Sequence, residues 1–245
     1  MKTAIIVNGF LRTWELAHSS FTNTFSHMSP DIFITTYDKQ YSYHPAVAGS
    51  FNIIGDNHLT DDDVIRMCSV VSPKMIVLDN FDDYEQDVED DIENIHPGMK
   101  TISGCYGQIR KLKNMADILK RYEEQNNFQY DVIIKTRTDL IYNDNLNLDL
   151  EPKQVIVDSS NIFPNDCIFA LHRDDFYSVV NFLYDEFYKY TIATSIDDPP
   201  HELFYNAFVN SNLNFVPRNI INHVLRSTGK HFYTKLKGKH DHNFT

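Results

Sequence analysis

The chain has 245 residues, of which 42% are hydrophobic and 23% charged, with only 8 glycines and 9 prolines. This composition excludes a disordered, fibrous or low-complexity protein, and the length allows one large domain or two small ones with a sizeable core. The 22 basic and 34 acidic residues give a net charge of −12, which argues against nucleic acid as a partner because phosphate contacts need clustered cations.

The cysteines and the apolar segments indicate the cellular setting. Cys68, Cys105 and Cys167 show no CxxC or Cys/His ligand spacing, so the sequence predicts neither a disulfide framework nor a zinc site. The apolar run at residues 4–7 is too short for a signal peptide, and no segment approaches the roughly 18 to 20 apolar residues of a membrane span. We therefore expect a soluble, cytoplasmic protein with reduced thiols and no transmembrane segment.

The first forty residues predict one strand–helix–strand unit. Residues 3–7 form an apolar run rich in β-branched side chains, which is typical of a strand covered on both faces. Apolar residues then recur every three or four positions from Thr13 to Met28, as in a helix that packs one face on a sheet, and Pro30 ends the pattern. Residues 31–37 repeat the strand pattern, so the sequence predicts an α/β fold.

The rest of the chain predicts further strands and helices without an internal repeat or a linker. The acidic run at residues 82–93 is typical of a solvated loop or helix face. Residues 108–124 form the clearest helical pattern and lead into a buried strand at 130–136. The remaining elements are expected as strands at 75–78, 155–157 and 167–170 and as helices at 174–190 and 201–210.

The last twenty residues are basic and include three histidines. They allow three interpretations: a flexible terminus, a lid over bound phosphates, or a contact with an anionic acceptor or membrane surface. In the second, Lys230, Lys235 or Lys237 would add positive charge when the ligand is bound.

Candidate ligand contacts follow the predicted strands, because an open α/β sheet binds its ligand beyond the carboxyl ends of the strands. Residues 8–12 contain Gly9, which lets the backbone approach a ligand, and Arg12, which can pair with phosphate. Residues 35–38 offer polar groups that can read a nucleoside, and residues 137–139 follow the central strand.

Asp139 is the carboxylate at the end of the predicted central strand. A divalent cation on a diphosphate needs only one or two protein carboxylates, because phosphates and waters supply the other ligands. The alternatives are a salt bridge between Asp139 and Arg137 or a capping role, and the residues alone leave both open.

Several sequence motifs that would indicate other chemistry are missing. The sequence contains neither GxGxxG nor GxxxxGK[ST], which argues against a dinucleotide oxidoreductase and a P-loop phosphotransferase. It also lacks GxSxG, which argues against an α/β-hydrolase.

Residues 8–13, 30–36 and 130–140 together resemble a group of polysaccharide and lipopolysaccharide glycosyltransferases from bacteria and large DNA viruses. The Lys-Thr-Arg-Thr-Asp-Leu stretch within the last segment is the most specific part. The resemblance spans about residues 1–210, and its weaker parts are residues 106–108, the helix with Lys111 and Lys113, residues 165–169 and residues 201–202.

This resemblance implies a GT-A fold, which is Rossmann-like, with a mixed central sheet and a less regular α+β C-terminal half. A single domain would cover residues 1–245. It would bind the nucleotide-sugar in about residues 1–140 and the acceptor in about 141–225, with a basic tail at 226–245.

The resemblance also implies a manganese or magnesium ion that bridges the diphosphate. In most GT-A enzymes the ion binds an Asp-x-Asp motif, whereas this chain has Arg137, Thr138 and Asp139 at that place. Asp139 is then the candidate ligand, with His223 as an additional one. Arg137 can support the diphosphate or substitute in part for the cation.

Transfer requires that the charge on the leaving diphosphate is neutralised and that a carboxylate deprotonates the acceptor hydroxyl. The metal, Arg12 and Lys111 are expected to serve the first purpose, although lysines on an amphipathic helix are ordinarily surface groups. Asp166 and Glu202 are rival candidates for the base, and both can instead be N-caps. The expected donor contacts are Asn8, Gly9, Phe10, Arg12, Thr36, Tyr37, Asp38, Lys111 and Arg137.

The sequence therefore predicts an enzyme that transfers sugar, with inversion, from a UDP-sugar or related donor to a hydroxyl of a surface glycan. It would act in the cytoplasm of a bacterial or virus-infected cell. One alternative is a nucleotide-sugar-binding module without catalysis, and a less favoured one is a sugar nucleotidyltransferase, which would need a glycine-rich phosphate loop.

Overall fold

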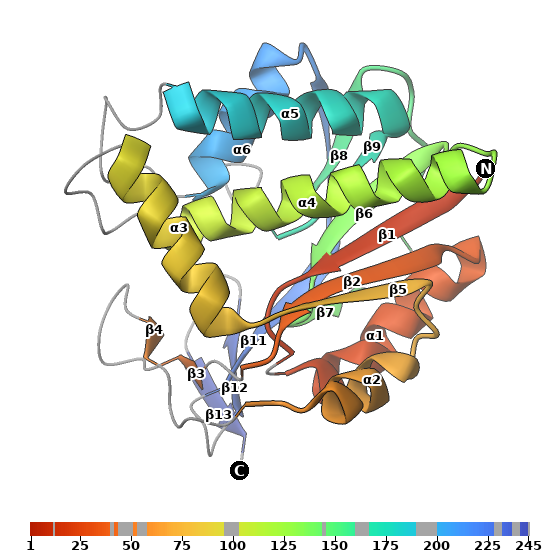
Figure 1. The fold of residues 1–245 in the computed structure, drawn as a ribbon. Coiled ribbons are helices and arrows are strands. Elements are labelled where there is room, and N and C mark those ends of the chain that lie inside the picture. Colours follow the sequence, from red (N-terminus) through yellow and green to blue (C-terminus); the bar gives the residue numbers. More distant parts are fainter. Residues whose placement is uncertain are drawn as a thin grey trace.

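The computed structural model describes residues 1–11, 13–39, 42–43, 51–52, 58–95, 103–143, 146–159, 167–189, 200–227, 232–236 and 241–244. A seven-stranded sheet forms the centre of the molecule, with helices on both faces (Figure 1). The chain is therefore an α/β protein, as the sequence predicts.

The central sheet has the order β10-β8-β9-β6-β1-β2-β5. Strand β9 is antiparallel to both its neighbours, and the other pairings in this sheet are parallel. The sheet is thus mixed, which confirms that part of the prediction. Its strands are β1 (Thr3–Asn8), β2 (Asp31–Tyr37), β5 (Met75–Asp79), β6 (Val132–Arg137), β8 (Gln154–Asp158), β9 (Phe169–His172) and β10 (Asn214–Arg218).

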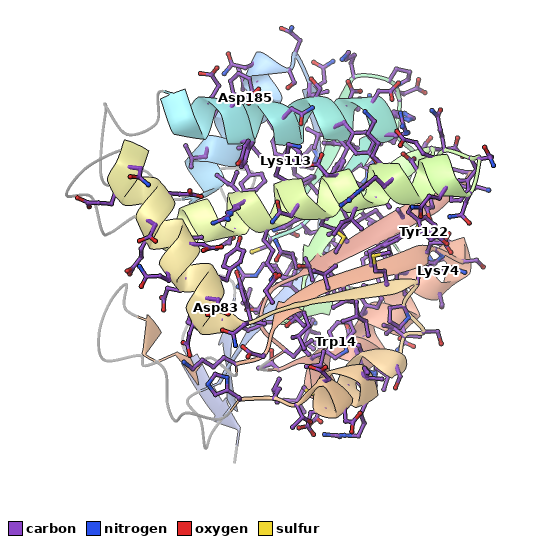
Figure 2. All side chains as sticks on the ribbon, in the orientation of Figure 1. Trp14, Lys74, Asp83, Lys113, Tyr122 and Asp185 are labelled. Atoms are coloured by element: carbon purple, nitrogen blue, oxygen red, sulfur yellow. The ribbon has the colours of Figure 1, made fainter. Side chains whose placement is uncertain are left out.

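One face of the sheet is covered by α1 (Trp14–Phe25), the short 3₁₀ turn η1 (Ser26–Met28) and α2 (Asp61–Ser69). Trp14 is buried there between the helices, and its indole N–H donates to the carbonyl oxygen of Met67 at 3.0 Å (Figure 2). The predicted helix at 13–28 is therefore confirmed as two pieces. Successive side chains of β1 point to opposite faces of the sheet, so this strand contributes to a hydrophobic core on each face. Ile5 and Val7 belong to the core on the α1 side.

The opposite face is covered by α4 (Ser103–Gln125), α5 (Arg173–Lys189) and α6 (Pro200–Asn210), and α3 (Phe81–Ile95) packs against α4. Tyr122 of α4 lies on this side of the sheet (Figure 2). The acidic run at 82–93 is a helix, and its surface stays solvated except at residues such as Val88. The apolar stripe of α4 is buried as predicted, at Ile109, Leu112, Met115, Ala116 and Leu119.

A second, four-stranded sheet has the order β13-β12-β11-β7. Its strands are β7 (Leu140–Tyr142), β11 (Ile221–Ser227), β12 (Phe232–Leu236) and β13 (Asp241–Phe244). Strands β3 (Ser42–Tyr43) and β4 (Phe51–Asn52) form a separate two-stranded sheet. The described residues of the basic tail belong to the four-stranded sheet, and the three interpretations of the tail stay predictions. Backbone pairing through β11 connects the tail to β7, directly after Asp139.

The sequence analysis missed helix α2, although a signal for it was present. Thr60 and Asp63 form a capping box: the Thr60 hydroxyl accepts from the Asp63 amide at 3.2 Å, and the Asp63 carboxylate accepts from the Thr60 amide at 3.2 Å.

Among the helices in the described part of the chain, none combines the length and the hydrophobicity of a transmembrane span.

Candidate functional site

The strand order reverses between β1 and β6. From β1 the chain continues to β2 and β5 on one side, whereas β6 is added on the other side of β1. Ligands of open α/β sheets bind beyond the carboxyl ends of the strands at such a reversal. We call the residues at these strand ends, 8–10, 36–38, 79–80 and 137–139, the carboxyl edge. Within it Asn8 is the register partner of Arg137.

The loop after β1 is held by its neighbours on both sides. The Gly9 amide donates to the carbonyl oxygen of Thr35 at 3.1 Å, and the Thr138 hydroxyl donates to the carbonyl oxygen of Phe10. Gly9 has φ +136°, a conformation that L-residues rarely adopt, and a Cβ there would lie 3.4 Å from the Thr138 hydroxyl oxygen. Glycine is therefore required at this position by the backbone itself.

Phe10 and Tyr37 form a ring stack on the carboxyl edge. Their centroids are 4.5 Å apart with an angle of 30° between the rings, and Phe81 contacts both. Tyr37 is only 7% exposed, whereas Phe10 is half-buried. Tyr84 of α3 packs on Tyr37 from another side at 5.3 Å. The accessible ring of the pair is thus Phe10, which Tyr37 supports.

Lys111 lies beneath Tyr37 and is fully buried, so it is not a surface group of α4. Its ammonium donates to the carbonyl oxygen of Thr36 at 2.8 Å and forms an ion pair with Asp79. Burial lowers the pKa of Lys111 to about 8, although Asp79 opposes this effect. In this position Lys111 supports the carboxyl edge from within.

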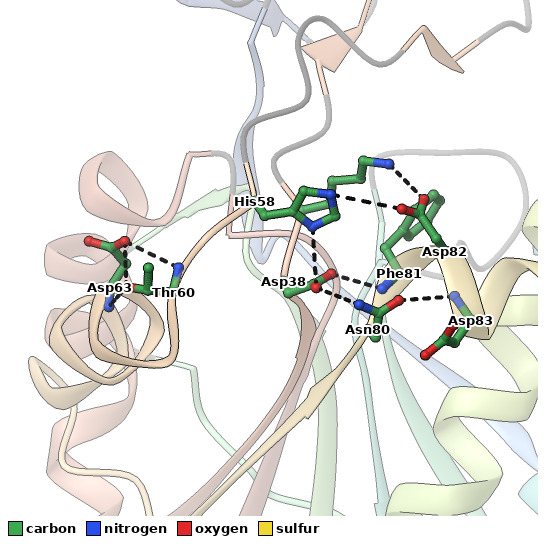
Figure 3. Close-up of polar contacts among 9 residues, drawn as sticks. Asp38, His58, Thr60, Asp63, Asn80, Phe81, Asp82 and Asp83 are labelled. Atoms are coloured by element: carbon green, nitrogen blue, oxygen red, sulfur yellow. Dashed lines mark hydrogen bonds and ion pairs between the residues drawn. The ribbon is translucent and has the colours of Figure 1, made fainter.

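Asp38 holds the start of α3. One carboxylate oxygen accepts from the Phe81 amide at 2.8 Å, and the other accepts from the Asn80 side chain at 3.0 Å and lies 3.3 Å from Nδ1 of His58 (Figure 3). The opposite ring nitrogen of His58 lies 3.8 Å from Asp82. These contacts assign Asp38 a structural role, while the predicted nucleoside contact stays a prediction.

Arg137 and Asp139 form a two-pronged ion pair at the end of β6. The guanidinium donates from Nε to one oxygen of Asp139 at 2.9 Å and from a terminal nitrogen to the other at 2.7 Å. The second terminal nitrogen lies 3.8 Å from Sγ of Cys167. The salt bridge that the sequence left open as an alternative is therefore present.

This donor set does not fit a divalent cation. Both oxygens of Asp139 are engaged by Arg137, and its side chain is buried. The manganese or magnesium ion stays a prediction.

No family model and no curated protein matches this chain. The fold and the arrangement at the carboxyl edge are therefore the basis for a functional proposal.

Four predicted site residues lie wholly or partly outside the part of the chain that the structure describes. Arg12 and Asp166 lie outside the described residues. Glu202 belongs to α6 and His223 to β11, where His223 pairs with Ile141 in the backbone register, but their side chains also lie outside the described part. Their predicted roles as base and metal ligand stay predictions.

The structure adds residues that the sequence analysis did not select, namely Asp79, Phe81 and Tyr84. Asp79 directly follows the predicted strand at 75–78 and is the last residue of β5. The rule that identified the other strand ends would have found it too. Phe81 and Tyr84 gave no such signal, because their role depends on where α3 packs.

Proposed function

We propose that this protein is a glycosyltransferase that binds a nucleotide-sugar, with a UDP-sugar as the first candidate, at the carboxyl edge and transfers the sugar to a hydroxyl of a glycan. The observation that carries the proposal is the convergence of the β1 and β6 strand ends at the reversal of strand order. The segments that meet there are those whose sequences resemble glycosyltransferases.

The carboxyl edge offers complementary groups for a nucleoside diphosphate. The half-buried ring of Phe10 can pack against a base, because aromatic rings stack on the π-face of any base. Gly9 places no side chain beside the Thr138 hydroxyl, from which an added Cβ would lie 3.4 Å. The Arg137 guanidinium, 17% exposed, places positive charge at the end of β6.

In the transfer reaction, the bond between the sugar and the diphosphate breaks as the acceptor oxygen attacks. Arg137 and Arg12 are the proposed cations for the charge that develops on the diphosphate. Asp166 or Glu202 would take the proton of the acceptor hydroxyl, and a single displacement would invert the anomeric carbon.

A thermal-shift panel of UDP, GDP, CMP and their sugar conjugates, with and without Mn²⁺, tests donor binding. A ligand that binds only the native state raises its apparent stability. We expect one nucleotide to raise the melting temperature of the wild type but not that of Phe10→Ala. If none of the nucleotides shifts the melting temperature, the donor site is wrong. The Mn²⁺ arm shows directly whether the ion contributes.

A nucleotide-sugar-binding module without catalysis is the second candidate. The ion pair of Arg137 with Asp139 favours it, because the pair engages the strand-end carboxylate that a metal-dependent transferase would use. Donor binding without transfer to any tested acceptor and without slow donor hydrolysis would support this candidate over the enzyme.

A further inference from the structure

Lys111 contacts the inner side of the aromatic residues at the carboxyl edge. Its Nζ lies 3.6 Å from the ring centroid of Tyr37 and 5.1 Å from that of Tyr84. Tyr37 in turn stacks on Phe10, with 4.5 Å between the centroids. Since Lys111 is only 1% exposed, a ligand at the edge contacts the rings and not the ammonium.

The surroundings of Lys111 come from four elements. Among the described residues, the charged or titratable groups that face its ammonium are Asp79 of β5, Tyr37 of β2 and Tyr84 of α3. On α4 itself, the Arg110 guanidinium lies 5.5 Å from the Tyr84 ring. A cation attracts the face of an aromatic ring most strongly when both are removed from water. The place of Tyr37 therefore depends on the charge of Lys111.

We propose that Lys111 is a positioning residue, whose Asp79-paired ammonium fixes Tyr37 and thereby the Phe10 ring on which the nucleobase packs. This role differs from direct neutralisation of the diphosphate. It rests on the proposed function for the identity of the ligand, but the arrangement of the rings can be measured without any ligand.

The first measurement is the dissociation constant of UDP by titration calorimetry. Lys111→Met should weaken binding about tenfold, the order of effect expected when a base loses its stacking partner. Phe10→Leu should weaken it to a similar extent, and the double variant should be no weaker than Phe10→Leu alone. The matched control is Lys113→Met on the same helix, where Lys113 pairs with Asp117 near the surface, and it should bind UDP within about twofold of wild type.

The second measurement needs no nucleotide. A 4-fluorophenylalanine at position 10 reports the ring environment through its ¹⁹F chemical shift. We expect the resonance to move in Lys111→Met and to stay unchanged in Lys113→Met. Asp79→Asn removes the counter-charge of Lys111 and keeps the lysine. If Lys111→Met does not fold, Asp79→Asn takes its place in both measurements.

The outcomes separate the positioning role from the proposed function. If UDP binds the wild type, and Lys111→Met binds it equally well or adds its full loss to that of Phe10→Leu, the positioning role is wrong while the donor site stands. If no nucleotide binds but the ¹⁹F resonance moves in Lys111→Met, Lys111 positions the rings and the proposed function fails. An unchanged resonance in both Lys111→Met and Asp79→Asn overturns the positioning role.

Discussion

Two ion pairs lie at the carboxyl edge, and they are built in opposite ways. In the pair of Lys111 with Asp79, the cation is 1% exposed and the carboxylate 32%. In the pair of Arg137 with Asp139, the carboxylate is 1% exposed and the cation 17%. In the first pair the carboxylate is the more exposed group, and in the second pair the guanidinium is the more exposed group. Of these two pairs, only the one at β6 therefore presents its cation to a phosphate.

The difference indicates what each charge does. A buried cation cannot reach a ligand, so Lys111 acts on the rings above it, whereas Arg137 can contact both Asp139 and an incoming anion. The sequence analysis treated both as cations for the diphosphate. Burial separates their roles.

The β6 pair should respond most strongly to loss of its cation. Arg137→Met leaves the buried Asp139 without its guanidinium, and breaking a buried ion pair costs about 3 to 5 kcal/mol. Urea denaturation should show this loss of the free energy of unfolding. The double variant Arg137→Met/Asp139→Leu should recover part of it, and a double variant that is less stable than the single one would contradict this account.

The loop between the two pairs should be the next most sensitive. Gly9→Ala must place a side chain at φ +136°, and such backbone strain costs about 1 to 3 kcal/mol. Gly107→Ala is the control, because that glycine lies inside α4 and its added Cβ would lie 3.5 Å from the Tyr84 ring, an ordinary contact. Thermal unfolding should show Gly107→Ala at least as stable as wild type, and equal losses in the two variants would refute the strain at Gly9.

The Lys111 pair should have a characteristic pH dependence. Burial lowers the pKa of Lys111 to about 8 in the folded state, below the unfolded value of about 10.4. Between these values the unfolded chain binds more protons, so the free energy of unfolding of wild type relative to Lys111→Met should rise with pH. The slope cannot exceed about 1.4 kcal/mol per pH unit. Urea denaturation at pH 7.5, 8.5 and 9.5 measures it, and a falling difference would mean that the folded-state pKa is raised.

A third, more exposed ion pair should contribute least to the free energy of unfolding. Lys113 and Asp117 pair one turn apart on α4, with Asp117 54% exposed. Exposed pairs of this kind contribute about 0.3 to 0.5 kcal/mol. Lys113→Met should therefore change the free energy of unfolding by no more than that, and a loss as large as that of Arg137→Met would remove burial as the explanation.

The local patterns of the sequence were sufficient for the α/β class and for six of the seven strands of the central sheet, whereas β10 was not predicted. Strands such as β1 and β6 contain apolar runs, at 4–7 and 132–134, because both faces are covered, and α4 shows its buried stripe plainly. The short strands of the second sheet were not predicted. These strands are stabilised by partners far along the chain, such as β11 for β7, which a local pattern does not reveal.

At the candidate site, too, the sequence did not predict contacts between residues that are far apart in the chain. The strand-end rule located Asn8, Tyr37 and Arg137 correctly at one edge, because the topology brings parallel strand ends together. It could not foresee that Lys111 pairs with Asp79, since these residues are 32 positions apart and the pair depends on how α4 packs on the sheet. The pairing of Arg137 with Asp139 is local, so the sequence could name it as an alternative.

The antiparallel strand β9 also sets the order in which the sheet can assemble during synthesis. Strand β8 leaves the ribosome before β9, yet its only neighbours within the described sheet are β9 and β10. The strands β1, β2, β5 and β6 can pair as soon as residue 137 has emerged, whereas β8 is connected to them only through β9. The N-terminal half is thus the template on which the nascent C-terminal half folds.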